Sequence, residues 1–376
     1  MKRTLILIIC LLIFVAGCSS AKEDGNHTGK VKAEGNPDVS ETTEETEETT
    51  HIQDPESSEQ EKAQSSEMTL TFTGDVLFAW SLEQTVAESG FEYPFQHVKD
   101  YFLQDDFTFV NFETPATERG VKEDKIYNFR TKPDAMDALA NVGVDGVALA
   151  NNHTLDFGID GLLDTLHFAD EAGLAAIGGG ANENQAYQAY ETTIQDKKVA
   201  FLNFSKVLPY IEWYAVGDRP GVASGYQMDR VLKIIEQTKQ TNDYVFVQIH
   251  WGKEKDTQFN ESEQAYAHAM IDAGADGIIG SHPHVLQGFE IYNGKLIAYS
   301  LGNFLFPDYV KGETAQTGVL QLEIDENEEA TYRFLPHFIE NDVIKPHPDA
   351  NGLAKALEQR SAPGITINEA FEITEQ

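Results

Sequence analysis

The sequence predicts an α/β fold in which short buried strands alternate with helices. Apolar runs at residues 144–150 and 244–250 are short and nearly continuous, which is typical of parallel strands covered on both faces. Helical patterns follow them along the chain. Several of these runs end abruptly at polar side chains, and ligands of open α/β sheets bind outside the carboxyl ends of the strands. The sequence therefore predicts a site at that edge of the sheet.

The expected elements follow from the periodicity of apolar residues along the chain. Strands are expected at residues 68–75, 107–113, 144–150, 175–178, 244–250 and 276–280. Hairpins are expected at 192–205, at 289–300 around an Asn-Gly turn, and at 319–335. Helices are expected over 82–88, 95–103, 133–142, 161–172, 228–241 and 264–273.

The amino terminus resembles a bacterial lipoprotein signal. Lys2 and Arg3 precede an apolar stretch at 5–15, which is too short to span a bilayer, and small residues then lead to Cys18. We expect residues 1–17 to be a signal peptide and Cys18 to carry lipid. The alternative is an uncleaved anchor. Both interpretations place the folded domain on the extracellular face of the cell membrane.

The next segment, residues 18–67, is acidic and nearly free of large apolar side chains, so we expect a disordered tether after the lipidated cysteine. A folded domain is expected over 68–345 and a peripheral tail over 346–376. The formal charge of −35 becomes −37 without Lys2 and Arg3. Such a chain repels nucleic acid, and an acidic substrate must be captured locally by metal or arginine.

The two cysteines of the chain, Cys10 and Cys18, lie in the signal and at the lipidation site, so the mature domain is expected to have no thiolate ligand. Any metal must then be held by His, Asp, Glu or Asn. Residues of these types end five expected strands: Asp75, Glu113, Asn152 with His153, His250, and His282 with His284.

Each of these residues also has a purely structural interpretation. Asp75 and Glu113 could each cap a turn or a helix, and Asn152 and its neighbours could form an Asx turn. His250 could be a buried histidine whose ring nitrogens are hydrogen-bonded within the core. The pair around Pro283 is harder to explain in this way. Two imidazoles two residues apart on an extended segment point the same way. Five unrelated turns need not all carry metal-ligand side chains, so the joint pattern favours a metal site.

The order of these residues resembles the calcineurin-like metallophosphoesterases, whose sites hold two metal ions. The spacing from Asn152-His153 to Asp156 is similar to the 5′-nucleotidase branch. A set of motifs between about residues 69 and 304 resembles more closely the CapA family of bacterial capsule-synthesis (poly-γ-glutamate) proteins. These motifs are Thr73-Gly-Asp, Asn111-Phe-Glu, Ala150-Asn-Asn-His, Asp156-Phe-Gly, His250-Trp-Gly, His282-Pro-His and Tyr299-Ser-Leu-Gly-Asn-Phe.

The resemblance implies a four-layer αββα sandwich of two mixed sheets flanked by helices. It also implies one or two divalent metal ions, and ligands without sulfur suit Mn, Mg, Zn or Fe without choosing between them. Water activated by the cations would be the nucleophile, and His153, oriented by Asp156, would act on the leaving group. The implied metal ligands are Glu113 as the bridge, Asn152, His250 and His282 at one ion, and Asp75 and His284 at the other; Arg130 and Asn303 are the candidates for substrate binding.

Two positions depart from the metallophosphoesterase pattern. The family usually carries histidine two residues after the first aspartate, where this chain has Leu77, and it commonly bridges the metals with aspartate, where this chain has Glu113. One metal site is therefore expected to be one ligand short.

The resemblance implies a part in making, exporting or anchoring poly-γ-glutamate or a similar envelope polymer. The first hypothesis is a metal-dependent hydrolase of a phosphoester or of an amide in the polymer, favoured by His153 and Asp156. The second is a non-catalytic accessory subunit that binds polymer or membrane synthase subunits, favoured by Leu77. An envelope phosphoesterase or nucleotidase is the third. It would need a base-stacking second domain, and no region of suitable size follows Phe304.

Overall fold

The computed structural model describes residues 67–376. The expected signal peptide, the lipidation at Cys18 and the tether up to residue 66 lie outside the described residues. Within residues 67–376, no helix has both the length and the apolar character needed to cross a membrane.

The larger sheet has eight strands in the order β16-β15-β14-β1-β2-β3-β4, and β13 pairs with the end of β1. Strands β1 to β4 run parallel, whereas β14, β15 and β16 are antiparallel to their neighbours. The strands are β1 (Met68–Val76), β2 (Phe107–Phe112), β3 (Gly146–Ala148), β4 (Ala175–Ile177), β13 (Asn303–Leu305), β14 (Gln316–Ile324), β15 (Ala330–Glu340) and β16 (Val343–Pro346).

The smaller sheet has six strands in the order β11-β12-β10-β9-β7-β6, with four parallel strands in its centre and an antiparallel strand at each edge. Its strands are β6 (Tyr190–Ile194), β7 (Lys197–Ser205), β9 (Tyr244–His250), β10 (Gly277–Ser281), β11 (Phe289–Tyr292) and β12 (Lys295–Ala298). Two small ladders pair β5 (Gly179–Gly180) with β8 (Gly221–Val222), and β17 (Ile365–Ile367) with β18 (Ile373–Glu375).

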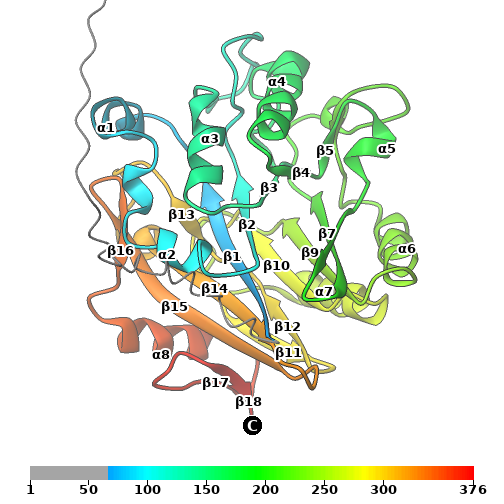
Figure 1. Cartoon of the computed structure of the whole chain (residues 1–376), viewed down its shortest axis with the longest axis vertical. Coiled ribbons are helices and arrows are strands. Elements are labelled where there is room, and N and C mark those ends of the chain that lie inside the picture. The colour runs from blue at the N-terminus through cyan, green and yellow to red at the C-terminus, as the bar shows by residue number, and fades with distance from the viewer. Residues whose placement is uncertain (1–66) are drawn as a thin grey trace, which may run out of the picture. The chain divides into compact units, whose positions relative to one another are not determined.

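Helices cover the outer faces of the sheets, with α2 and α3 over β1 and β2, and with α6 and α7 beside β7 and β9 (Figure 1). They are α1 (Ser81–Ser89), α2 (Lys99–Phe102), α3 (Asp134–Asn141), α4 (Gly158–Glu171), α5 (Glu183–Ala186), α6 (Met228–Lys239), α7 (Glu261–Asp272) and α8 (Ala350–Arg360), with 3-10 turns η1 (Tyr93–Phe95), η2 (Ile211–Trp213) and η3 (Gly312–Ala315).

The inner faces of the two sheets pack on each other through aromatic side chains. Phe107 of the larger sheet stacks on Phe201 of the smaller sheet, with ring centroids 4.2 Å apart, and Phe72 contacts Phe246 at 5.6 Å. Separate buried clusters lie between each sheet and its helices. Two mixed sheets between two helical layers confirm the predicted four-layer fold.

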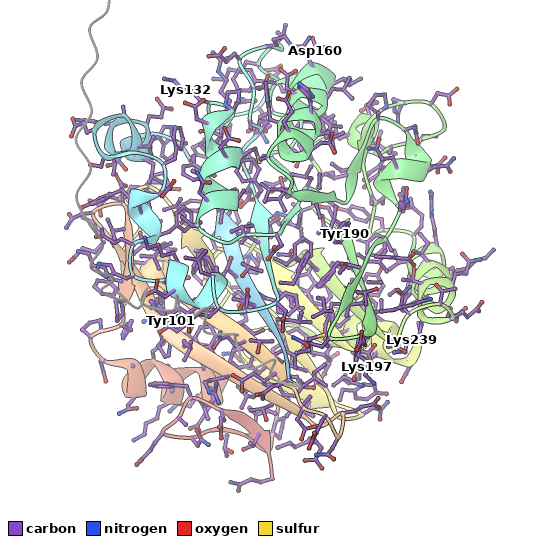
Figure 2. The ribbon with its side chains drawn as sticks, in the orientation of Figure 1. Tyr101, Lys132, Asp160, Tyr190, Lys197 and Lys239 are labelled. Atoms are coloured by element: carbon purple, nitrogen blue, oxygen red, sulfur yellow. The ribbon has the colours of Figure 1, made fainter. Side chains whose placement is uncertain are left out.

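The parallel strands fix which edge carries the polar residues. Lys197, the first residue of β7, and Lys239 lie at the amino-terminal edge of the sheets, whereas Lys132 and Asp160 lie beyond the opposite edge (Figure 2). Because the carboxyl ends of β1, β2 and β3 point toward that opposite edge, the loops that follow these strands gather there.

The tail over 346–376 is not peripheral, contrary to expectation. Helix α8 and strands β17 and β18 carry apolar residues that belong to the main core between the sheets, including Leu357 and Ile373. Leu357 is fully buried. Its helix repeats apolar residues at helical spacing, which the polar composition of the segment obscured.

Candidate metal centre

Strand register brings the first polar residues together at one edge of the larger sheet. Asp75 of β1 lies opposite Asn111 of β2 and opposite Asn303 of β13. The side chain of Asn111 donates a hydrogen bond to Asp75 Oδ1 at 2.7 Å. Glu113 follows β2 directly, and its backbone N–H donates to the carbonyl of Val76. These contacts hold both carboxylates at the carboxyl ends of adjacent strands.

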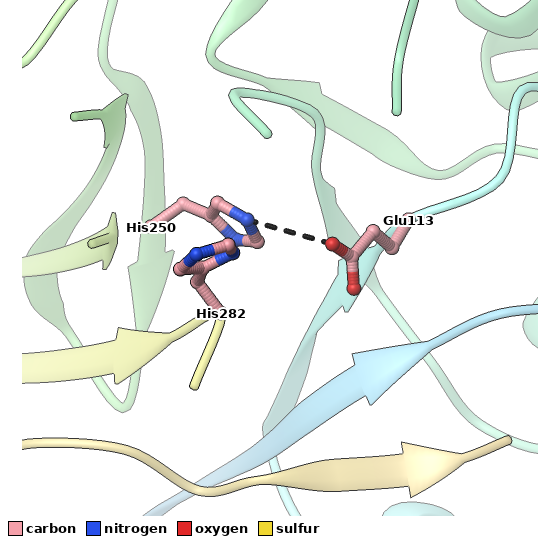
Figure 3. Close-up of side chains that lie close together, drawn as sticks. All are labelled: Glu113, His250 and His282. Atoms are coloured by element: carbon pink, nitrogen blue, oxygen red, sulfur yellow. Dashed lines mark ion pairs between the residues drawn. The ribbon is translucent and has the colours of Figure 1, made fainter. Parts of the chain in front are cut away.

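Two groups of potential ligands meet at Glu113. One consists of Glu113, His250 and His282, and the other of Asp75, Glu113 and His284. In each group the ligand atoms lie within 4.8 Å of one another. Figure 3 shows the imidazoles of His250 and His282 facing the Glu113 carboxylate, with His250 Nε2 3.4 Å from Oε1. The arrangement has the form of two adjacent cation sites that share one carboxylate.

Asn152 adds an oxygen to the first group. Its Oδ1 lies 2.8 Å from His250 Nε2, and the other ring nitrogen of His250 lies 3.0 Å from Ser281 Oγ. Ser281 sits opposite His250 in the pairing of β9 and β10, so the sheet itself orients the ring. A partner on Nδ1 leaves Nε2 free to face a ligand.

The second group is oriented in a similar way. His284 Nδ1 lies 3.0 Å from Asp75 Oδ2 and 2.9 Å from Asn303 Oδ1. The amide nitrogen of Asn303 donates to the carbonyls of His284 and Thr314. Asn303 is 1% exposed, and the contacts that the structure gives it orient His284. Its expected role in substrate binding stays a prediction.

The chemistry of these donors fits divalent cations. Burial, together with the charge of Asp75, raises the pKa of Glu113 well above its usual value. Burial lowers the pKa of His250 well below its usual range, and it lowers the pKa of His282 to about 3. Neutral imidazoles and a buried carboxyl group whose oxygens accept no hydrogen bond from the described residues are donors that suit a metal ion.

Unpartnered polar atoms support the same conclusion. Within the described residues, neither carboxylate oxygen of Glu113 accepts a hydrogen bond, and Nδ1 of His282 has no partner. Buried polar groups are nearly always paired, so such a concentration at one point calls for a missing partner. One or two divalent ions bound by Glu113 and its neighbours would provide it.

His153 lies beside the cluster and is held by Asp156. Its Nδ1 is 2.8 Å from Asp156 Oδ2, which also accepts the backbone N–H of Phe129. Burial lowers the pKa of His153, although its bond to Asp156 opposes the shift. The predicted pairing of His153 with Asp156 is present in the structure, while its catalytic role stays a prediction.

Lys125 was not predicted as a site residue. Its Nζ lies 2.5 Å from Asp156 Oδ1 and 3.2 Å from His153 Nδ1. The same ammonium group donates a hydrogen bond to the backbone carbonyl of Asn152. Burial lowers its pKa, and the charge of Asp156 opposes that shift. Lys125 comes from an irregular loop without periodicity, so the sequence carried no signal for it beyond an exposed-looking lysine.

The two asparagines before His153 divide their roles. Asn151 Oδ1 accepts the backbone N–H groups of His153 and Thr154, which is the Asx turn that the sequence left open. Asn152 is thereby left to face His250.

The expectation of an extended segment at His282 and His284 is wrong, because both have positive φ (97° and 58°) and their imidazoles belong to different ligand groups.

Arg130 lies away from the cluster of ligands. Its guanidinium stacks over the ring of Phe157 at 4.6 Å, and it lines a cavity of about 520 Å³ beside α1.

Leu77, where the metallophosphoesterase pattern has a histidine, is 1% exposed and packs among apolar side chains that include Phe129 and Phe306. It offers no ligand atom to either group.

Comparisons with known proteins identify relatives over most of the chain. Residues 69–308 match the model of the family described as "Bacterial capsule synthesis protein PGA_cap". The "Capsule biosynthesis protein CapA" of Bacillus anthracis is 33% identical over 74% of this chain and 69% of its own length. The "PGA biosynthesis protein CapA" of Bacillus subtilis is 32% identical over 72% of this chain and 71% of its own. A solved structure, the NAD nucleotidase of Haemophilus influenzae, aligns over 79% of this chain and 57% of its own with a TM-score of 0.42 and 13% identity.

Proposed function

This chain belongs to the bacterial capsule synthesis protein PGA_cap family, and we propose that it acts there as a metal-dependent hydrolase. The observation that carries the proposal is the buried cluster around Glu113, next to the pair formed by His153 and Asp156. A purely structural cluster would need neither the unpartnered oxygens of Glu113 nor an oriented histidine beside them.

The residues of the chain have distinct tasks in this proposal. Glu113, His250, His282 and Asn152 would hold one cation, and Asp75 and His284, together with Glu113, would hold a second. Bound divalent cations supply Lewis acidity and lower the pKa of water. Asp156 and Lys125 keep the ring of His153 in place, and His153 transfers a proton to the leaving group.

The substrate in this proposal is a phosphoester or an amide bond of poly-γ-glutamate or of a similar envelope polymer. An acidic chain repels a polyanion, so capture depends on the cations of the site. We also propose that lipid on Cys18 anchors the protein to the extracellular face of the membrane, near membrane synthase subunits. The apolar stretch and the small residues before Cys18 support this.

A second candidate function is that of a non-catalytic accessory subunit. Leu77 favours it, because this buried side chain stands where metallophosphoesterases usually carry a further ligand. A centre with weak metal binding would then serve to stabilise a surface that binds polymer or synthase.

The two candidates are separated by two alanine variants of the full-length protein. His153→Ala should abolish turnover and leave the metal content nearly unchanged, since His153 is in neither ligand group. Loss of a general acid typically costs about 10²–10⁴-fold in rate. His282→Ala should lose metal, because it removes an imidazole from the first group. Elemental analysis and a screen over phosphoesters and γ-glutamyl polymers measure both effects.

Polymer production in a deletion strain provides the decisive comparison. If His153→Ala restores production as well as the unmodified protein does, catalysis is not required and the accessory function is correct. Full activity of His153→Ala in the purified protein would likewise contradict the hydrolase.

A further inference from the structure

A continuous group of aromatic side chains borders the metal centre. It comes from three loops that are far apart in the sequence, and we call it the aromatic wall. Trp80 lies at its middle, with ring centroids 5.0 Å from Tyr309, 5.2 Å from Phe129 and 6.3 Å from Tyr127. Phe306 extends it beyond Tyr309 at 6.1 Å.

Both ends of the aromatic wall contact residues of the candidate centre. The ring of Phe129 lies 4.7 Å from that of His153, and the ring of Phe306 lies 5.1 Å from that of His284. A substrate group bound on this wall would therefore lie next to the reacting bond.

The wall remains largely open to solvent. Trp80 is 47% exposed, Tyr127 58% and Tyr309 55%. Packing alone would bury such large apolar rings, so their exposure beside a polar centre needs another reason. Trp80 is also held at φ 53° and ψ −112°, a backbone conformation that costs on the order of 1–3 kcal/mol for a residue other than glycine. Residues held in such conformations cluster at ligand sites.

Charge around the wall restricts what it can bind. The five side chains of the wall are neutral aromatic rings. A cationic group bound on them would lie close to the divalent ions expected at Glu113. An anionic group would be drawn to those ions and would not need the rings. The ligand that the rings themselves favour is neutral and has an apolar face.

We propose that the aromatic wall is a sugar-binding subsite, on which the apolar face of a pyranose ring packs beside the metal centre. The C–H groups of such a face carry partial positive charge and lie favourably against the negative face of an aromatic ring. Only the statement that the sugar lies beside a reacting bond rests on the proposed function, because sugar binding itself requires no turnover. Of the substrates proposed above, the subsite favours an envelope polymer that carries a sugar next to the reacting bond over poly-γ-glutamate alone.

A cavity formed in part by residues next to the wall in the sequence has a lining that suits a hydroxyl-rich ligand. It has a volume of about 520 Å³ and is lined by Arg130, which follows Phe129 in the chain, and by residues of helix α1, which follows Trp80. Its charged groups balance, two basic against two acidic, and two threonines add hydroxyls over an apolar floor. The charged groups and threonines are Arg130, Lys132, Glu83, Glu118, Thr117 and Thr131.

The test uses the full-length protein and the tetramer of N-acetylglucosamine as the probe. Trp213 and Trp251 are buried, so Trp80 is the exposed one among the three tryptophans of the chain, and its fluorescence reports binding at the wall. We expect a saturable change in emission. By calorimetry, Trp80→Ala and Tyr309→Ala should each weaken binding at least about ten-fold, while Trp80→Phe should retain most of it.

Tyr226→Ala is the matched control, because Tyr226 is 53% exposed but has its ring contact with Tyr214 and not with the wall. Its affinity for the tetramer should equal that of the unmodified protein. His282→Ala should lose metal and still bind the tetramer, which separates a failure of the subsite from a failure of the proposed hydrolase.

Three results would overturn the sugar subsite. They are no emission change at millimolar tetramer, equal affinity of Trp80→Ala and the unmodified protein, and stronger Trp80-dependent binding of adenosine or of a γ-glutamyl tetramer than of the sugar.

Discussion

Substitution of Glu113 by glutamine should have opposite effects on the metal-free and the metal-loaded protein. The carboxylate is fully buried, and neither oxygen accepts a hydrogen bond within the described part of the chain. An unsatisfied buried polar group costs about 1–3 kcal/mol, and more if it is charged. Glutamine keeps the size of the side chain and is neutral at every pH, whereas burial raises the pKa of Glu113 because its ionised form is costly in this position. The metal-free Glu113→Gln protein should therefore be more stable than the unmodified one.

The charges of the cluster support that direction. Burial alone would lower the pKa of His284, but the carboxylates of Glu113 and Asp75 raise it to about 9, so at neutral pH one cationic ring faces two carboxyl groups. His250 and His282 are neutral because burial lowers their pKa values. Removing the charge of Glu113 leaves Asp75 and His284 as a balanced pair.

Metal binding should change in the opposite direction. A ligand at 100 times its dissociation constant stabilises the folded state by about 2.7 kcal/mol. Glu113 belongs to both ligand groups, so its replacement should remove most of that gain. In a domain of 150–250 residues 1 kcal/mol corresponds to about 2–4 °C in melting temperature, and in the larger domain over residues 67–376 the shift is smaller. Without metal, we expect Glu113→Gln to melt several degrees higher than the unmodified protein. Added metal should raise the melting temperature of the unmodified protein by several degrees and leave that of Glu113→Gln unchanged.

Thermal unfolding in EDTA and in MnCl₂ or ZnCl₂, with elemental analysis, measures both effects. Glu263→Gln is the control, because Glu263 is a buried carboxyl group that caps α7 through Asn260. It should lower stability equally with and without metal. The reasoning would be refuted if Glu113→Gln melted lower than the unmodified protein in EDTA, or gained as much from added metal.

Four further substitutions test separate features. Lys125→Met should lower kcat at least about ten-fold with the metal content unchanged, because it leaves Asp156 uncompensated beside His153; an unchanged kcat would contradict this. Burial, with the charges of Asp145 and Asp106, raises the pKa of Asp105 to about 7, so the folded protein should lose stability as pH rises from about 4 to 7. In urea unfolding, Asp105→Asn should therefore be more stable than the unmodified protein at pH 8 and not at pH 4. Leu357→Asp should cost at least about 3 kcal/mol, because it puts a carboxyl group into the core between the sheets; near-normal urea stability would show that the tail is dispensable. Leu77→His should raise the metal-to-protein ratio towards two if a ligand is missing, whereas two tightly bound ions in the unmodified protein would show that none is.

Most of the fold could be predicted from the sequence, because the apolar pattern is strong where the strands are buried. Strand β9 was predicted to the residue, since 244–250 is nearly all apolar and ends at His250. The hairpin at β11 and β12 was marked by the Asn293-Gly294 turn. Helix α7 begins earlier than expected, at Glu261, although the capping box of Asn260 and Glu263 was readable.

The candidate centre was predictable where it depends on strand ends and not where it depends on loops. Asp75, Glu113 and His250 end buried strands, and the carboxyl-end rule brings them together. Lys125 reaches Asp156 through the path of an irregular loop, which no periodicity predicts. The aromatic wall likewise depends on how three loops meet in space.

Leu77 connects the departure from the family pattern with the aromatic wall. It is 1% exposed, and its apolar cluster includes Phe129 and Phe306, the two buried members of the wall. The leucine packs in the same apolar cluster as the two rings that contact His153 and His284. The position that the resemblance assigns to a metal ligand therefore belongs, in this chain, to the packing behind the aromatic wall, so a change at Leu77 acts on the wall as well as on the metal centre.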